Sequence, residues 1–144
     1  MVKIMLIILM SLVSFIGLAQ NQNSQDEFFK VTVEINNITS DQGNVYYSIY
    51  DSKENFKNRI PLKSEKAIIK GGKSTISFND LKAGTYSILC YHDKNDNKKM
   101  DFSLNGMPLE DYGMTNNVMI FGPPTFGDGK FEVSDTNLTF EIKF

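Results

Sequence analysis

Apolar and polar residues alternate with a period of two over much of the chain after residue 28. In the first such run, Phe29, Val31, Val33 and Ile35 share one face, and the residues between them are polar. Successive side chains of a strand point to opposite sides, so this run predicts a half-buried β-strand. Similar runs cover residues 45–50, 67–70, 74–78, 85–91 and 138–144.

Turn residues separate these runs. Gly71-Gly72 lies between two of them and suits a tight hairpin. The only segment with helical character runs from Ser52 to Asn58, which is enough for one short turn. Strands at this spacing predict an all-β protein of about seven strands. We expect an antiparallel β-sandwich, immunoglobulin-like or transthyretin-like, with long loops at one end, and a closed barrel is the alternative.

The first residues of the chain have the pattern of a secretory signal peptide. An apolar stretch from Ile4 to Leu18 follows Lys3 and ends beside the small residues Gly17 and Ala19. A retained membrane anchor is the alternative, but a spanning helix needs roughly 20 apolar residues. We therefore expect a signal peptide at 1–19, a flexible tether at 20–27 and a single β-sandwich domain at 28–144. The mature protein is then exported, whether periplasmic, at the cell surface or secreted, with no membrane span.

Charge and cysteine content narrow the function. Removing the leader takes away Lys3 and leaves 14 basic against 17 acidic residues, a formal charge of −3. This balance argues against a nucleic-acid partner, which needs a clustered positive face. Cys90 is the only cysteine, so no disulfide forms within the chain. It alternates with Ile88 in a strand-like run, which favours a buried and unreactive thiol.

The segment after residue 92 carries the spacing of a calcium loop. Asp93, Asn95 and Asn97 place side-chain oxygens at positions one, three and five, and Asp101 falls at position nine. The backbone carbonyl of Lys99 would supply position seven. The alternative is a solvated turn, because Asp and Asn readily hydrogen-bond their own backbone.

Two departures weaken the match. Lys98 stands at position six, where the helix-loop-helix motif has Gly, and Leu104 stands at position twelve, where it has Glu. The loop is therefore not of the helix-loop-helix type, and its affinity is expected at about 10⁻⁴–10⁻³ M. Further oxygens, or supporting contacts, are expected from the polar residues around the loop, namely His92, Asp96, Glu110 and Asp111. His92 is the only histidine, so a zinc site lacks its ligands.

Two long loops follow: residues 104–117 are rich in Gly and Asn, and residues 121–128 contain two prolines. Loops of this length carry function or cover the open end of a core. We expect them to form one surface, with Tyr112 and Phe126 as exposed aromatic contacts. The residues expected to meet a ligand are Met107, Pro108, Tyr112, Asn116, Pro124 and Phe126.

An ordered set of motifs is similar to one known family. The motifs are His92-Asp93 with its loop, Gly106-Met107-Pro108, Tyr112-Gly113, Asn116-Asn117 and Pro123-Pro124-Thr125-Phe126. They resemble the domain of unknown function 2141 family of small secreted bacterial proteins. That resemblance implies export and a β-sandwich, and it makes the loop and the Gly-Met-Pro segment a unit. The family usually has Gly at position 98 and often Ile at position 107.

No sequence motif for catalysis is evident. The chain has neither a Gly-x-Ser-x-Gly elbow nor a set of metal-binding histidines. We expect an exported, non-enzymatic binding or structural module that holds calcium and meets an envelope protein, a peptide or a glycan. One alternative is an envelope accessory or assembly subunit without metal. The other is a metal-assisted hydrolase, in which a bound metal, or His92 with Asp93, activates water.

Overall fold

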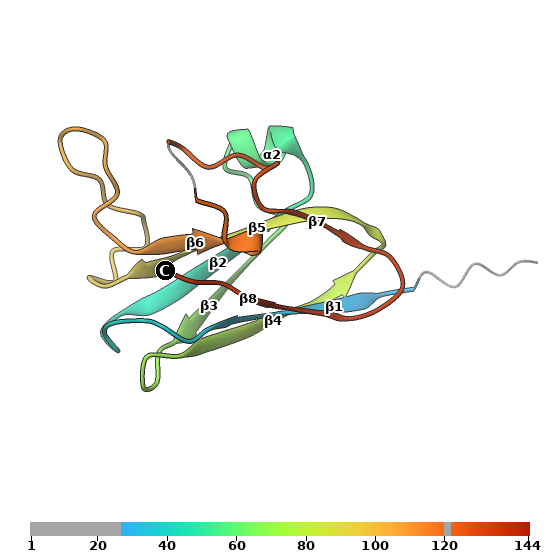
Figure 1. The fold of residues 1–144 in the computed structure, drawn as a ribbon, viewed down its shortest axis with the longest axis horizontal. Coiled ribbons are helices and arrows are strands. Elements are labelled where there is room, and N and C mark those ends of the chain that lie inside the picture. Colours follow the sequence, from blue (N-terminus) through green and yellow to red (C-terminus); the bar gives the residue numbers. More distant parts are fainter. Residues whose placement is uncertain (1–26, 120–121) are drawn as a thin grey trace, which may run out of the picture.

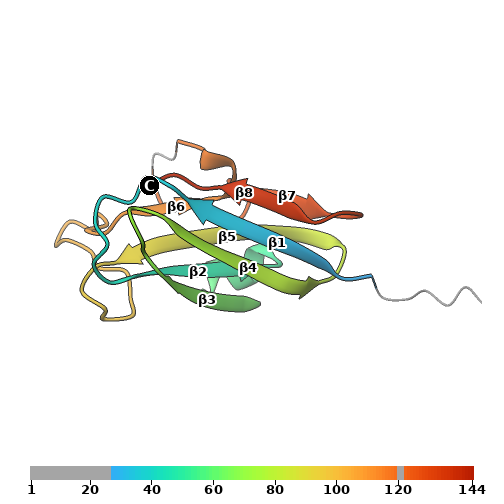
Figure 2. The ribbon, with the colours of Figure 1, turned by 90° about the horizontal axis from the view of Figure 1, so that it is seen from below.

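The computed structural model describes residues 27–119 and 122–144. The expected leader, residues 1–19, and all but the last residue of the expected tether, residues 20–27, lie outside this range. The described residues form eight strands in two sheets that pack face to face (Figures 1 and 2). None of the helices in these two ranges is long and apolar enough to cross a membrane.

The sheets contain three and five strands. The first has the order β4 (Ser74–Leu81), β1 (Phe29–Ile35) and β8 (Leu138–Glu141). The second has the order β3 (Lys63–Ile68), β2 (Asn44–Tyr50), β5 (Gly84–Asp93) and β6 (Tyr112–Met114), and β7 (Lys130–Val133) also pairs with β5. Figure 2 shows β1 and β4 lying across β2 and β5. The predicted all-β sandwich is confirmed.

The core lies between the sheets and follows the alternation of the sequence. All four apolar residues of β1 between Phe29 and Ile35 are buried, as predicted. Ile88 and Cys90 of β5 meet them from the other sheet, and Ile142 closes the same core. Each such aliphatic side chain contributes about 1.5–3 kcal/mol when fully buried. Burial of the Cys90 thiol, predicted from its place in the run, is also confirmed.

One pairing differs from the antiparallel expectation. β8 runs parallel to β1, with Val31 opposite Leu138 and Val33 opposite Phe140, whereas the other strand pairs are antiparallel. The chain leaves β7 in the second sheet, crosses at residues 134–137 and enters the first sheet beside β1 (Figure 1). A connection that changes sheets in this way brings β8 alongside β1 in the same direction.

The Gly71-Gly72 turn forms as predicted, but it joins two different sheets. Both glycines have positive φ, 59° and 73°, and Lys70 and Lys73 exchange backbone hydrogen bonds of 2.9 and 3.2 Å. The Asp41 carboxylate accepts the N–H groups of both glycines at 2.8 Å. β3 then pairs with β2, and β4 with β1. The turn therefore makes a corner of the sandwich rather than the end of a two-stranded ribbon.

Two local features support this architecture. The Tyr86 hydroxyl donates a hydrogen bond to the carbonyl of Lys82 at 2.9 Å, an arrangement found at the tyrosine corner of β-sandwiches. The predicted helical turn is α2 (Lys53–Lys57), where Ser52 accepts the N–H of Asn55 at the helix start.

Between β5 and β6, residues 94–111 project from one end of the sandwich, opposite the end where β1 begins (Figure 1).

Candidate functional site

The calcium-type loop starts from a buried carboxylate at the end of β5. Asp93 is the last residue of that central strand and is fully buried, opposite Asn44 on β2. Its Oδ1 accepts the N–H of Asn97 at 3.1 Å, and its Oδ2 accepts the N–H of Lys98 at 2.7 Å. A buried carboxylate needs such donors, and here they come from its own loop. Asp93 therefore winds the chain into a tight turn.

The other three predicted side chains gather at this turn. Asn95 and Asn97 donate their amide N–H groups to Asp101 Oδ2 at 2.7 and 2.8 Å. Their amide oxygens accept the backbone N–H groups of Asn97 and Lys99, both at 3.1 Å. Lys98 has φ 66°, the left-handed conformation that favours Gly. The structure thus brings Asp93, Asn95, Asn97 and Asp101 to one turn that their own hydrogen bonds hold.

Glu110 joins the two ends of this loop. It is buried, and its Oε1 accepts the N–H of Lys94 at 3.0 Å while its Oε2 accepts the N–H of Asp101 at 3.2 Å. Asp111 pairs with Lys94 Nζ at 3.0 Å on the surface. Asp96 accepts a hydrogen bond from Asn44 Nδ2 at 3.1 Å. Of these acidic neighbours, Glu110 alone bonds to the backbone of the loop at both ends.

His92 lies beside the loop in sequence but on the other face of the sheet. It is fully buried, and its side chain alternates with that of Asp93 along β5. Its Nε2 lies 2.7 Å from the carbonyl oxygen of Gln42, and its Nδ1 has no hydrogen-bond partner among the described residues. The adjoining Gly43 has φ 73°, and a Cβ there would lie 1.9 Å from the Asp93 carbonyl oxygen. Glycine is therefore required where this turn passes the loop.

The carboxylates around the loop leave an electrostatic signature on Tyr91. Its ring stacks on Tyr46 with centroids 5.5 Å apart. Burial, followed by the negative charge of Asp93 and smaller contributions that include Glu110 and Asp101, raises the pKa of the Tyr91 hydroxyl to about 12. The carboxylates of Asp93, Glu110 and Asp101 therefore lie close enough to Tyr91 to act on its hydroxyl.

The donor set differs from that of a transition-metal site. Within residues 27–119 and 122–144, no group of three or more His, Cys, Asp or Glu side chains is arranged to hold a metal ion. The turn offers two carboxylates, Asp93 and Asp101, and two amides, Asn95 and Asn97. A cation there would depend on amide and backbone oxygens, which are ligands for a hard ion such as Ca²⁺.

A narrow hairpin, residues 102–109, extends from this loop, and we call it the apolar finger. The N–H of Leu109 donates to the Asp101 carbonyl at 2.9 Å, and Phe102 pairs with Pro108. Ser103 holds the tip, since its N–H donates to the Met107 carbonyl at 2.8 Å and its hydroxyl accepts the Met107 N–H at 3.1 Å. Met107 and Pro108, both expected to meet a ligand, therefore belong to one ordered element.

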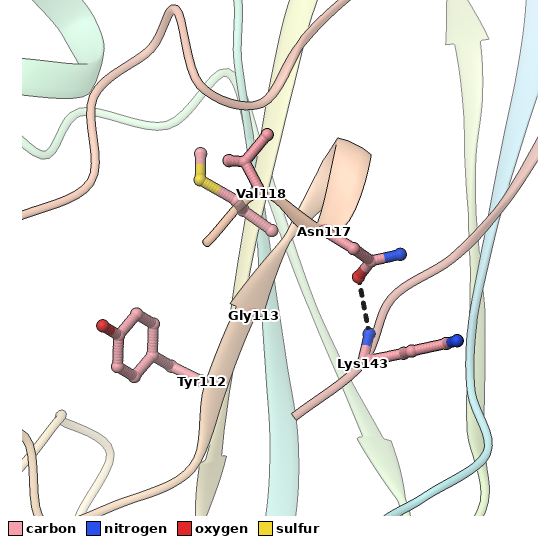
Figure 3. A pocket seen from close by; sticks show the side chains of 6 residues that line it. Tyr112, Gly113, Asn117, Val118 and Lys143 are labelled. Atoms are coloured by element: carbon pink, nitrogen blue, oxygen red, sulfur yellow. Dashed lines mark hydrogen bonds between the residues drawn. The ribbon is translucent and has the colours of Figure 1, made fainter. Parts of the chain in front are cut away.

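A shallow pocket of about 350 Å³ adjoins β6 (Figure 3). Six residues line it, namely Tyr112, Gly113, Met114, Asn117, Val118 and Lys143. Figure 3 shows Asn117 turned toward Lys143, whose N–H donates to its Oδ1 at 2.8 Å. Asn117 Nδ2 also donates to the Glu141 carbonyl at 2.7 Å. Asn117 therefore connects the end of β6 to β8.

Asn116, expected to meet a ligand, has a comparable structural position. Its Nδ2 donates to the carbonyls of Asp128 and Lys130, at 3.2 and 3.0 Å. Both Asn116 and Asn117 have positive φ, 72° and 49°. This Asn pair thus joins β6 to β7 and β8. Sequence reasoning missed that role, although Asn-Asn is a pair that tolerates the left-handed conformation.

The expectation that Phe126 is an exposed contact residue is wrong. Phe126 is only 6% exposed, and its ring lies 6.4 Å from that of Phe56. The loop that carries it folds back over α2, so its apolar ring is covered (Figure 1). Pro124 is half-buried in the same loop, and Tyr112 is half-buried at the pocket. The two long loops therefore do not present both aromatic residues on one open surface.

Comparison with known proteins identifies the family. A model of the bacterial family described as "Uncharacterized protein conserved in bacteria (DUF2141)" matches residues 33–141, and the chain belongs to this family. The match spans from β1 to the last residue of β8 and so includes the loop, the apolar finger and the Asn pair. No curated protein and no solved structure matches the chain.

Proposed function

We propose that this member of the family is an exported, non-enzymatic β-sandwich binding module that acts through the loop end, where a calcium ion fixes the surface. One observation carries the proposal. The amides of Asn95 and Asn97 converge on Asp101 at 2.7 and 2.8 Å, next to the carboxylate of Asp93. Four oxygen-bearing side chains at calcium-loop spacing therefore meet at one turn.

Ion binding would require the side-chain amides of Asn95 and Asn97 to rotate. At present their nitrogens face Asp101 and their oxygens face backbone N–H groups. Rotation of each amide by half a turn would exchange nitrogen for oxygen beside the Asp101 carboxylate. Each rotation gives up a backbone hydrogen bond, which contributes about 0.5–1.5 kcal/mol. This loss and the left-handed Lys98 favour a modest affinity, of about 10⁻⁴–10⁻³ M.

The ion's role would be to fix the apolar finger. Glu110 holds the N–H of Asp101, and the Asp101 carbonyl holds the N–H of Leu109, so the loop and the finger share one base. A cation held by the Asp101 carboxylate would fix the position from which the finger extends.

A binding role is also favoured over catalysis by the burial of the reactive groups. His92 is fully buried, on the opposite face of the sheet from the loop. Burial raises the pKa of the Cys90 thiol, whose Sγ donates to the Gly113 carbonyl at 3.3 Å. Neither group meets solvent, where a substrate would have to bind.

Calorimetry on the secreted protein tests the calcium site. We expect a Kd of about 10⁻⁴–10⁻³ M for wild type and at least tenfold weaker binding for Asp101→Asn. Asp96→Asn is the matched control, because it removes the same charge from a side chain that bonds to Asn44 instead. Lys98→Gly should tighten binding, since glycine suits its φ of 66°. Wild type that takes up no calcium at about 10 mM would refute the site.

Export is tested separately. The protein is expressed from its full reading frame, and the N-terminus of the form found outside the inner membrane is sequenced. A leader removed after Ala19 gives an N-terminal Gln20. Protein found only in the cytoplasm, or one that keeps residues 1–19, would contradict this part of the proposal.

A further inference from the structure

The apolar finger exposes several large apolar side chains to solvent. Four of its eight residues have large apolar side chains. Leu104 is fully exposed, and Phe102, Met107 and Leu109 are 49%, 62% and 63% exposed. Single exposed apolar residues are common, but a contiguous group on a protruding element marks an interaction site. The group lies at the end of the sandwich that carries the calcium-type loop (Figure 1).

The finger is held in shape before it meets any partner. Hydrogen bonds fix its base and tip, among them those from Leu109 to Asp101 and from Gly106 to Ser103, both 2.9 Å. Gly106 has φ 80°, which a tight turn at the tip requires. An element ordered in advance loses little conformational entropy on binding. The finger is therefore already ordered with its apolar side chains exposed for contact with a partner.

Two lysines near the finger, Lys98 and Lys99, have no ion-pair partner among the described residues. All five acidic residues between positions 93 and 111 are hydrogen-bonded or ion-paired, namely Asp93, Asp96, Asp101, Glu110 and Asp111. Lys94 pairs with Asp111. Lys98 and Lys99 are exposed, and neither forms an ion pair with a described residue. The loop end therefore offers two free ammonium groups beside an apolar projection.

We propose that the apolar finger docks on an anionic lipid surface, with Lys98 and Lys99 meeting the headgroups. Apolar side chains enter the boundary between headgroups and acyl chains, while lysines bind anionic lipid, a combination typical of peripheral membrane contact. A projection rather than a groove suits insertion into a bilayer.

Calcium strengthens this contact, and in that respect the inference rests on the proposed function. Residues 93–111 contain five acidic and three basic side chains, which gives a net charge of −2. A divalent cation would bring this segment to neutrality and lower its repulsion from anionic lipid. The contact should therefore be stronger in calcium than in a chelator, and weaker at high salt.

A single tryptophan in the finger tests the inference. The chain contains no tryptophan, so Leu104→Trp supplies the only one. The fluorescence of this variant is titrated with vesicles of phosphatidylglycerol and phosphatidylcholine, or of phosphatidylcholine alone, in calcium or in chelator. We expect a blue shift with the anionic vesicles only. Ile68→Trp, at an apolar position 61% exposed on the edge strand β3, is the control and should not shift.

Cosedimentation of the otherwise unchanged protein gives the magnitudes. Leu104→Ser should weaken vesicle partition by about tenfold, and each of Lys98→Gln and Lys99→Gln by about fivefold. Equal partition in calcium and chelator would support lipid docking while removing the calcium dependence, which calorimetry measures independently. No partition of wild type into anionic vesicles under either condition overturns the inference. An equal blue shift for Ile68→Trp does the same.

Discussion

Replacement of Gly113 by alanine tests the close contact between β6 and the C-terminal end of the chain. An added Cβ would lie 2.6 Å from Ile142 Cγ2, 2.6 Å from the Lys143 carbonyl oxygen and 3.3 Å from Phe144 Cδ1. Ile142 is fully buried, and a backbone carbonyl cannot rotate away. Gly113 has no positive φ, so the effect is one of steric overlap and not of backbone strain.

The expected loss follows from these contacts. Overpacking a filled site costs about 1–3 kcal/mol, and the reduced freedom of the unfolded chain offsets about 0.4–1 kcal/mol of it. Two overlaps below 3.0 Å place Gly113→Ala toward the upper end. We expect a net loss of about 2 kcal/mol in the free energy of unfolding, and a fall in Tm of roughly 5–12 °C.

Urea unfolding followed by circular dichroism measures this loss. Gly127→Ala is the matched control, because its Cβ would meet only Thr125 Oγ1 at an ordinary 3.7 Å. The control should unfold at the urea concentration of wild type or slightly above it. If Gly113→Ala and Gly127→Ala unfold at the same urea concentration, the reasoning about this contact is wrong.

Three further predictions concern the sandwich. Hydrogen bonds from the N–H groups of Gly72 and Gly71 lower the pKa of Asp41 below its ordinary 3.8. The contribution of the Asp41 carboxylate to folding stability is therefore complete above pH 3.8, and it is lost as pH falls through the lower folded-state pKa. Denaturant unfolding across this range should therefore show a smaller acid-induced loss of stability for Asp41→Asn than for wild type; equal losses would contradict it. Tyr86→Phe should lower the unfolding free energy by about 0.5–1.5 kcal/mol, because the bond to Lys82 is lost; an unchanged urea midpoint would count against it. Cys90, whose pKa burial raises, should react with iodoacetamide only under denaturing conditions, as mass spectrometry would show, and rapid native labelling would disagree with its burial.

The sequence was most informative where structure depends on neighbouring residues. The alternation from Phe29 to Ile35 determined a strand and its buried face, because the side-chain period of a strand is two. Gly71-Gly72 determined a turn, since both positions need positive φ. The spacing from Asp93 to Asp101 indicated a wound loop, because such a loop also depends on neighbouring residues. The hydrogen bonds that the Asp93 and Asp101 side chains accept there join residues no more than six positions apart.

The short strands were beyond this reasoning. β6 and β7 contain three and four residues, too few for a period to be recognised. They are strands because both pair with the long β5, and the paired residues are 21 or more positions apart along the chain. The parallel pairing of β8 with β1 likewise depends on a partner more than 100 residues away.

The tertiary structure alone decided what the loop end presents to solvent. Phe126 and Leu104 are both large apolar residues in long loops. Phe126 is buried because it packs against Phe56, whereas Leu104 is fully exposed. Glu110 was a candidate ligand in the sequence, and in the fold its two oxygens close the loop. Local patterns determined which segments are strands and turns, because propensity and period act over a few residues. Which side chains are free to bind depended on contacts between distant segments, which form only when the two sheets pack.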